Sequence, residues 1–272
     1  MTHQTDDTNG TSEAETLRSR RHFLEKVATI TFGTMTLTLF PGWSGSDEES
    51  SGSDGEKPSN DDQPPIFGYL VDTRKCVGTG KCLTACRVEN DVPDGCHRTW
   101  VERYVHFKDG TVQVDLVPET GYADSDMAAI NPDDVERAYF VPKNCNHCED
   151  APCNQVCPVH ASFTSPEGVT LIDDERCIGC AYCVQACPYG VRFINPVTET
   201  ADKCTWCYHR IMRSEAPACV EACPVGARIF GRLDDPNSEI IRRIAKFPTQ
   251  VLKEHLGTRP ITRYIGITGE VT

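Results

Sequence analysis

The sequence predicts an α+β protein that consists of two small pseudo-symmetric modules with insertions, preceded by a disordered N-terminal segment. The first observation is that sixteen cysteines occur in 272 residues and fall into repeated groups from Cys76 onward. The second is that short runs of β-branched and apolar residues alternate with short helical patterns. The third is that residues 1–65 contain no cysteine and end in a stretch rich in Ser, Gly, Asp and Pro.

Short strands are expected wherever β-branched or alternating residues follow one another. They are Phe67–Asp72, Thr111–Val117, Tyr139–Val141, Val169–Ile172, Arg192–Ile194, Arg228–Gly231 and Thr262–Ile267. Short helices are expected after Cys82, Cys153, Cys183 and Cys219. A longer helix is expected over Ser238–Phe247, with Asp235-Pro236-Asn237 as its capping segment.

The folded domain is expected to run from residue 66 to residue 267. Its inner module covers residues 140–195, and its outer module joins residues 66–87 to residues 200–233. Residues 88–139 form an insertion, rich in acids near Asp124–Glu136, that is expected to dock a partner. A C-terminal helix and tail follow over residues 234–272.

The net charge of −13 argues against a nucleic-acid partner, because the chain has no basic excess with which to replace the counterions of a phosphate backbone. Part of this charge lies in the early acidic stretch over residues 47–62, so it says little about the folded surface. The only long apolar run, Val27–Phe40, is interrupted by threonines and is shorter than the roughly twenty residues of a membrane-spanning helix.

The segment Ser19-Arg20-Arg21-His22-Phe23-Leu24 directly before this run resembles a twin-arginine (Tat) export signal. Lys26 stands one place later than in the usual pattern, and no small-x-small cleavage site follows. We therefore expect a signal over residues 1–43, a flexible linker over residues 44–65, and a protein at the extracytoplasmic face of the membrane. The Tat route moves folded proteins, so metal clusters inserted in the reducing cytoplasm would survive export.

The cysteines form four groups with related spacing. The third group is C-x2-C-x2-C-x3-C-P, the run found in bacterial ferredoxins, and the second and fourth have longer middle gaps. In the first group, Thr79 stands where the second cysteine would be. The groups in chain order are Cys76, Cys82 and Cys86; Cys145, Cys148, Cys153 and Cys157; Cys177, Cys180, Cys183 and Cys187; and Cys204, Cys207, Cys219 and Cys223.

This spacing indicates cubane iron–sulfur clusters, because three thiolates of a tight loop reach three irons and the fourth points away toward a neighbouring cluster. A structural zinc site needs four ligands per ion and has no use for the longer run. A disulfide framework, the other alternative for an exported protein, does not need C-x2-C spacing within one loop.

Exchange of the fourth cysteine between paired groups predicts the ligand sets. The second and third groups together have the size of a complete two-cluster ferredoxin, which leaves the first to pair with the fourth. The predicted [4Fe–4S] sets are Cys145, Cys148, Cys153 and Cys187; Cys157, Cys177, Cys180 and Cys183; and Cys86, Cys204, Cys207 and Cys219. The remaining set is Cys76, Cys82 and Cys223.

This remaining set has three thiolates, which suit a [3Fe–4S] cluster. Three alternatives stay open: a [4Fe–4S] cluster completed by the Thr79 hydroxyl, a cluster completed by Cys96, and an empty site. A small buried hydrophobic role is the ordinary expectation for Cys96.

The arrangement from Phe67 to Ile267 resembles the four-cluster electron-transfer subunits of the DMSO reductase superfamily, of the polysulfide, tetrathionate and DMSO reductase β-subunit types. The segments that carry the resemblance are Gly68-Tyr69-Leu70-Val71-Asp72, Asn144-Cys145-Asn146-His147-Cys148, Ala151-Pro152-Cys153, Asp202-Lys203-Cys204-Thr205-Trp206-Cys207 and Gly257-Thr258-Arg259-Pro260 before Tyr264.

The resemblance implies a linear row of clusters in a non-catalytic subunit. It implies a catalytic, molybdopterin-containing partner and an NrfD-like, quinone-reactive membrane partner. A redox complex with cytochrome partners and no molybdopterin subunit, of the Dsr or Hmc type, is the alternative. Around the cysteines, His147 is expected to pack or hydrogen-bond, Trp206 and Tyr182 to shield a cluster, and Lys203 to be solvated.

Overall fold

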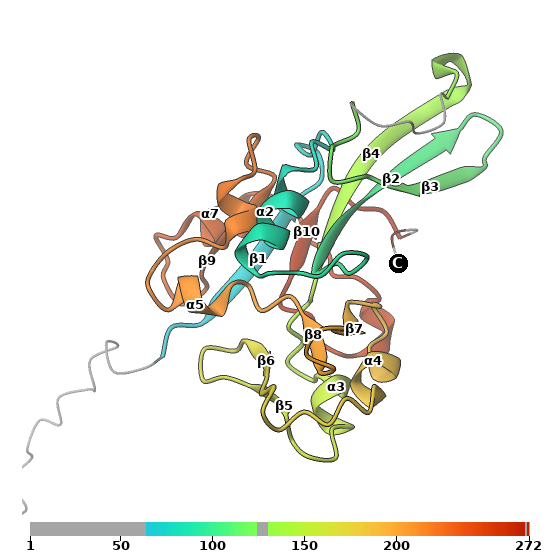
Figure 1. Cartoon of the computed structure of the whole chain (residues 1–272). Coiled ribbons are helices and arrows are strands. Elements are labelled where there is room, and N and C mark those ends of the chain that lie inside the picture. Colours follow the sequence, from blue (N-terminus) through green and yellow to red (C-terminus); the bar gives the residue numbers. More distant parts are fainter. Residues whose placement is uncertain (1–63, 124–129, 270, 272) are drawn as a thin grey trace, which may run out of the picture. The chain divides into compact units, whose positions relative to one another are not determined.

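The computed structural model describes residues 64–123, 130–269 and 271 (Figure 1). The expected signal over residues 1–43 and almost all of the expected linker lie outside the described residues. So does part of the acidic stretch of the insertion. Within the described part of the chain, no helix has the length and apolar character needed to cross a membrane.

The first sheet joins the start of the described chain to its end. Strand β1 (Phe67–Asp72) lies between β9 (Arg228–Arg232), which is antiparallel to it, and β10 (Arg263–Ile265), which is parallel. All six residues of β1 are buried, and both faces of the strand are apolar up to Asp72 at its end. Helix α7 (Glu239–Lys246) covers one face of this sheet through Ile240. On the other face, Tyr69 and Val71 of β1 belong to the core that contains Cys82, Cys145, Cys204 and Cys219.

The second sheet is formed by the insertion. Strands β2 (Thr99–Phe107), β3 (Val112–Leu116) and β4 (Val135–Asn144) are antiparallel in the order β3-β2-β4, and their far ends project beyond the rest of the described chain (Figure 1). The 3-10 turn η2 (Pro132–Asp134) leads into β4. The other end of β4 delivers the chain directly into the second cysteine group.

Two small hairpins separate the later cysteine groups. Strand β5 (Ser162–Thr164) pairs with β6 (Thr170–Ile172), and β7 (Arg192–Ile194) pairs with β8 (Ala201–Lys203). A short 3-10 turn, η3 (Glu254–Leu256), lies in the C-terminal tail.

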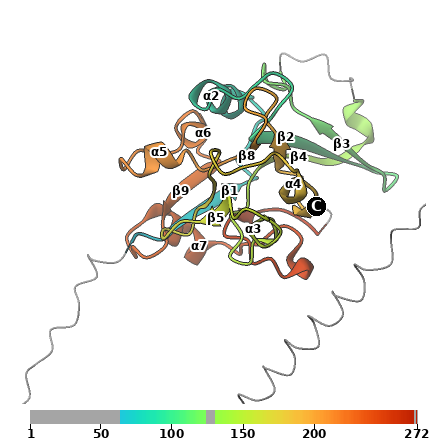
Figure 2. The same cartoon turned by 60° about the horizontal axis from the view of Figure 1, so that its bottom comes forward.

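Short helices begin within or directly beside each cysteine group. Helix α2 packs against α6, and α3 packs against α4 (Figure 2). The first cysteine group therefore lies against the fourth, and the second against the third. The bounds are α2 (Lys81–Glu89), α3 (Pro152–Gln155), α4 (Tyr182–Ala186), α5 (Tyr208–Ile211) and α6 (Ala218–Glu221).

Most expected elements are present with bounds shifted by one or two residues, and the mixed helix and strand content is confirmed. Sequence reasoning missed β2, β5, β8 and α5, and it placed only three residues of the long strand β4. Strand β2 was missed because charged side chains interrupt its apolar pattern, yet Arg103 is buried and ion-paired with Asp115. Helix α7 begins after Ser238, whose Oγ accepts a bond from the Ile241 amide at 3.5 Å, so the cap is Ser238 itself and not the segment before it.

All four cysteine loops share one backbone turn. The second residue after the first cysteine of each group has a left-handed conformation, and these residues are Gly78 (φ 67°), His147 (φ 45°), Gly179 (φ 65°) and Trp206 (φ 54°). Glycine adopts this conformation without steric penalty, whereas His147 and Trp206 must be held in it by their surroundings. The shared turn is structural evidence that the four loops are versions of one motif.

A second shared turn follows the C-P dipeptides. The third residue after the cysteine is again left-handed at His160, Gly190 and Gly226, and its amide bonds to the cysteine carbonyl at 3.3 to 3.4 Å. The next amide along points at the sulfur in two cases, from Ala161 to Cys157 and from Ala227 to Cys223, both at 3.2 Å. The turn therefore aims backbone donors at the cysteine sulfur.

The shared turn predicts a sharp effect of Gly179→Ala. The left-handed conformation costs an alanine about 1–2 kcal/mol, and the added Cβ would lie 2.4 Å from the Glu199 carbonyl oxygen. We expect lower iron content and an unfolding midpoint lower by about 4 °C or more, measured on anaerobically purified protein. Gly269→Ala is the control, because it meets no atom within 4 Å. Unchanged iron and midpoint in Gly179→Ala would contradict the prediction.

Candidate iron–sulfur centres

All sixteen cysteines lie in the described part of the chain, and all are free thiols. Most are buried or half-buried, and Cys180 is the exposed one. Among the described residues, no three His, Cys, Asp or Glu side chains converge as ligands of a single metal ion. The predicted ligand sets are called here site A (Cys145, Cys148, Cys153 and Cys187), site B (Cys157, Cys177, Cys180 and Cys183), site C (Cys86, Cys204, Cys207 and Cys219) and site D (Cys76, Cys82 and Cys223).

The structure brings the thiols of site A together. Burial raises the pKa of Cys148 to about 12, and the charges of Cys145, Cys153 and Cys187 act in the same direction. Thiols that raise one another's pKa are close neighbours in a poorly solvated space. Such a group is stable as thiolates only if positive charge, such as iron, lies between them.

Site C is gathered in the same way, from α2 on one side and α5 and α6 on the other. Burial raises the pKa of Cys86 well above its usual value, and the charges of Cys204, Cys219 and Cys207 add to this. The Asn90 amide spans two of these thiols, with its Nδ2 3.7 Å from the Cys86 sulfur and 3.6 Å from the Cys207 sulfur.

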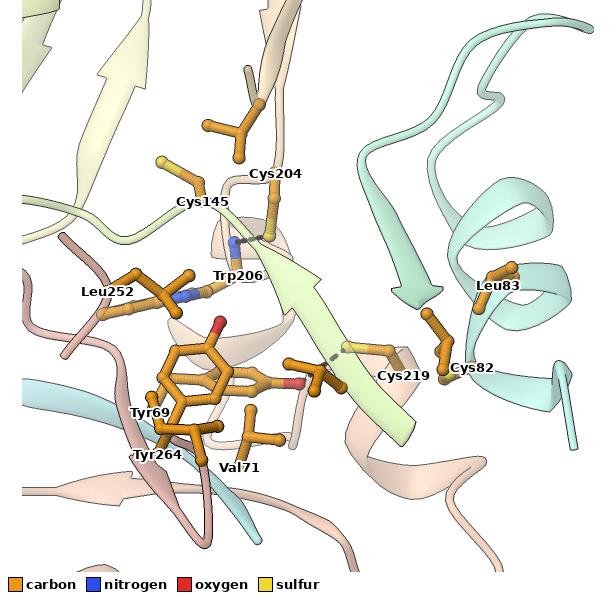
Figure 3. Close-up of a cluster of buried hydrophobic side chains, with 14 of the residues drawn as sticks. Tyr69, Val71, Cys82, Leu83, Cys145, Cys204, Trp206, Cys219, Leu252 and Tyr264 are labelled. Atoms are coloured by element: carbon orange, nitrogen blue, oxygen red, sulfur yellow. Dashed lines mark hydrogen bonds between the residues drawn. The ribbon is translucent and has the colours of Figure 1, made fainter. Parts of the chain in front are cut away.

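Site C has two further polar contacts in the core. The Tyr69 hydroxyl lies 3.2 Å from the Cys219 sulfur, and the Trp206 amide donates to the Cys204 sulfur at 3.4 Å (Figure 3). Such donors to sulfur stabilise the ionised ligand and are expected around an iron–sulfur cluster.

Site B is partly assembled and lies nearer the surface. Cys183 and Cys177 pack with Cys148 and Cys153 of site A. At Cys157, burial acts to raise the pKa of the thiol, but four backbone amides around its sulfur outweigh burial and lower the pKa. The Ala201 amide donates to the Cys177 sulfur at 3.3 Å. The described contacts do not join Cys157 or Cys180 to the other two thiols of this site.

Site D is a cavity lined by all three of its predicted thiols and by Thr79. Burial raises the pKa of Cys76 to about 11, and the charges of Cys82 and Cys223 contribute. Thr79 contributes to the lining although the residue as a whole is exposed. The cavity thus unites the first and fourth cysteine groups at the position of the missing cysteine.

Cys96 lies elsewhere. It lines a separate cavity with Cys86 and Arg87, and Arg87 donates to the Cys96 carbonyl at 3.3 Å. Cys96 is therefore not among the residues that line site D, and its half-buried position agrees with a packing role.

The sites form a row in the order B, A, C, D. Cys183 packs beside Cys153 between sites B and A. Burial raises the pKa of Cys204 to about 11, and the charges of Cys219 in its own site and of Cys145 in site A add to it. Burial likewise raises the pKa of Cys219, on which Cys82 of site D acts across the next gap. The two end sites, B and D, therefore have one neighbouring site each, and sites A and C have two.

The residues around the row correct two expectations, for Lys203 and Tyr182, and agree with a third, for His147. Lys203 is not solvated but fully buried, and its Nζ donates to the carbonyls of Thr170 and Cys204. His147 is also fully buried and stacks on Trp206 with ring centroids 3.9 Å apart. Burial lowers its pKa well below the usual value, so the ring is neutral and its Nδ1 accepts from the Thr170 amide at 3.0 Å. Tyr182 is 58% exposed and shields little.

Sequence reasoning missed several polar residues that lie close to these thiols. Asn90, Arg192 and Arg228 lie outside the cysteine motifs, so no spacing rule identifies them. Tyr69 was noted only as part of a strand. The signal available was indirect, because a polar residue within an otherwise apolar strand, such as Arg228 in β9, requires a buried partner.

Comparison with known proteins supports iron–sulfur clusters in this chain. A family model described as a 4Fe-4S dicluster domain matches residues 136–233. The B subunit of tetrathionate reductase from Salmonella typhimurium is 37% identical over 255 residues, which cover 92% of this chain and 88% of that protein. Its counterpart from Archaeoglobus fulgidus is 44% identical over 222 residues, covering 82% and 91%. Protein NrfC of Escherichia coli is 41% identical over 196 residues, covering 71% and 78%.

The contacts of Asn90 predict a measurable effect at site C. In Asn90→Leu the side chain keeps its volume but loses both donors to sulfur, so the reduced, more negative cluster is less stabilised. We expect a lower midpoint potential for one of the clusters and a loss of stability of about 1 kcal/mol. Redox titration followed by EPR checks the first effect, and thermal unfolding the second. Asn237→Leu, at an exposed position outside the sites, is the control. Equal potentials in the two variants would contradict this role.

Proposed function

The chain belongs to the family of reductase iron–sulfur subunits that includes protein NrfC and the B subunits of tetrathionate and polysulfide reductases, and on this premise we propose how it relays electrons within a reductase complex. One end of the row receives electrons from a quinone-reactive, NrfD-like membrane subunit or delivers them to it. The other end serves a catalytic subunit that contains molybdopterin. The observation that carries this proposal is the linear order of the four thiol sites.

The proposed ligand sets are sites A to D. Sites A, B and C each offer four thiols to a [4Fe–4S] cluster, and site D offers three to a [3Fe–4S] cluster. When bound, the clusters supply one-electron carriers. The packing of α3 on α4 and of α2 on α6 supports two pseudo-symmetric modules, each holding two clusters. The protein itself holds the clusters at fixed positions along the row and excludes water from them.

We also propose export through the Tat route and a position at the extracytoplasmic face of the membrane, on the strength of the twin arginines Arg20 and Arg21. The insertion is proposed to dock a partner subunit. Its edge strand β3 supports this, because Val112, Val114 and Leu116 point to one face and are 43%, 49% and 65% exposed. Replacement of this insertion without loss of the partner subunits would contradict the docking role.

The alternative function keeps the relay but changes the partners to cytochromes, without a molybdopterin subunit. The similarity to NrfC leaves room for it, because that relative is not named as part of a reductase that acts on a sulfur compound or a sulfoxide. The genes beside this one separate the two functions. A gene for a large molybdopterin protein supports the first, and a multihaem cytochrome gene supports the second.

If the chain relays electrons, its deletion should affect the quinol-linked activity of the complex and not the dye-linked activity. A reduced viologen dye feeds the catalytic subunit directly, whereas quinol must act through the row. In native membranes, deletion of the chain should lower quinol-linked reduction of tetrathionate or polysulfide more than tenfold and leave dye-linked reduction by the solubilised catalytic subunit in place.

Complementation sharpens this test. Cys180→Ala removes a thiol of site B and should fail to restore the quinol-linked rate, whereas Cys96→Ala, outside the four sites, should restore it. Restoration by both variants would count against the relay.

The three-thiol site predicts a second result. Oxidised, anaerobically purified protein should give the EPR signal of a [3Fe–4S] cluster, and Thr79→Cys, which supplies the fourth thiol, should lose it and gain about one iron per molecule. The control is Thr84→Cys, which lies in the following helix α2 and outside the cavity lining, and it should keep the signal. If fully loaded wild-type protein lacks the signal, the three-iron assignment is wrong.

A further inference from the structure

Three buried cationic side chains lie along the row of thiol sites. Arg192, Lys203 and Arg228 are 4%, 0% and 2% exposed. In the described part of the chain, none of them forms a salt bridge with a carboxylate. A buried cation without an opposite charge is strongly unfavourable, so each needs a negative partner other than Asp or Glu.

Arg228 lies between sites C and D. Its Nη1 donates to the Tyr69 hydroxyl at 3.2 Å. That hydroxyl is in turn 3.2 Å from the sulfur of Cys219 in site C, as Figure 3 shows. Arg228 also lines the cavity of site D, where Cys82 acts on it electrostatically. Its Nη2 donates to Thr99 Oγ1 at 2.8 Å, and its Nε has no protein partner.

Lys203 lies between sites A and C. It directly precedes Cys204, and its Nζ donates to the Cys204 carbonyl at 3.0 Å and to the Thr170 carbonyl. The charges that act on it include Cys145 and Cys153 of site A and Cys204 of site C.

Arg192 lies between sites B and A. Its Nη2 donates to Ser162 Oγ at 2.8 Å, while its Nη1 has no protein partner. The thiols that act on it are Cys153 and Cys145 of site A and Cys183 of site B. One buried cation therefore occupies each of the three gaps in the row.

We propose that Arg192, Lys203 and Arg228 are the internal counter-ions of the relay, one to each gap, and that each stabilises the reduced state of the two carriers beside it. This inference rests on the proposed function, because it takes the thiol sites to hold anionic clusters. One electron leaves a carrier and enters its neighbour, and no atom or proton moves with it. A fixed cation beside both carriers offsets the negative charge in either location, so it raises both potentials together and limits repulsion between adjacent reduced clusters.

Arg228 gives the sharpest test, because a guanidinium stays charged in any protein setting. We compare the full-length, anaerobically purified protein with Arg228→Gln, which removes the charge, and Arg228→Lys, which keeps it. The control is Arg103→Gln, which also removes a buried arginine but one paired with Asp115 in the second sheet. The readout is the set of midpoint potentials from EPR-monitored redox titration, together with iron content.

We expect two midpoint potentials to fall in Arg228→Gln, each by about 59 mV or more. For one electron, this shift corresponds to a tenfold change in the ratio of reduced to oxidised cluster. Arg228→Lys should restore most of the shift, and Arg103→Gln should show none. Two unchanged potentials in iron-loaded Arg228→Gln would overturn the inference while leaving the relay intact. A wild-type protein without iron–sulfur signals would instead overturn the proposed function.

If Arg228→Gln fails to bind iron, variants of the buried cations in the other two gaps still test the inference. Lys203→Met should lower the potentials of the clusters in sites A and C, and Arg192→Gln those in sites A and B. If all three neutral variants fail to bind iron while Arg103→Gln binds it normally, the three side chains serve assembly and not potential, and the inference is wrong.

Discussion

The rest of the structure depends on the convergence of cysteine sulfurs in the protein interior. Cys82, Cys145, Cys204 and Cys219 belong to the main hydrophobic core, and some thiols are so poorly solvated that burial raises their pKa to about 11 or about 12. A core of this kind is stable only when iron offsets the thiolate charge. Folding and cluster insertion are therefore expected to be one process for this chain.

The helices and strands around the thiols are short, and the turns between them orient the cysteine sulfurs and the backbone amides that donate to them. Four loops share a left-handed turn after the first cysteine, and three share another after the C-P dipeptide. In the described part of the chain the insertion contains the longest strands, β2 and β4, and β4 leads the chain directly into the second group. The scaffold is thus a set of repeated turns held together by helix pairs, with one sheet closing each flank.

Much of this was predictable, because cysteine spacing is a local property of the sequence. The four groups and the helices beside Cys82, Cys153, Cys183 and Cys219 follow from it, and most strands follow from local runs of β-branched and alternating residues. The buried polar residues do not, because their roles depend on contacts between distant segments. Lys203 looks like an ordinary surface lysine beside a motif, and only the fold places it among Cys145, Cys153 and Cys204. Strand β2 was missed for the same reason, since its charged residues are buried by pairing with another strand.

The central claim is that the thiols hold iron–sulfur clusters as a row of carriers. Iron and acid-labile sulfide analysis of the anaerobically purified protein, with Mössbauer spectroscopy of the same sample, tests it most directly. The account predicts roughly fifteen irons per molecule, mostly in [4Fe–4S] environments with a smaller three-iron component. A colourless protein containing zinc, or one whose cysteines are joined as disulfides, would contradict it.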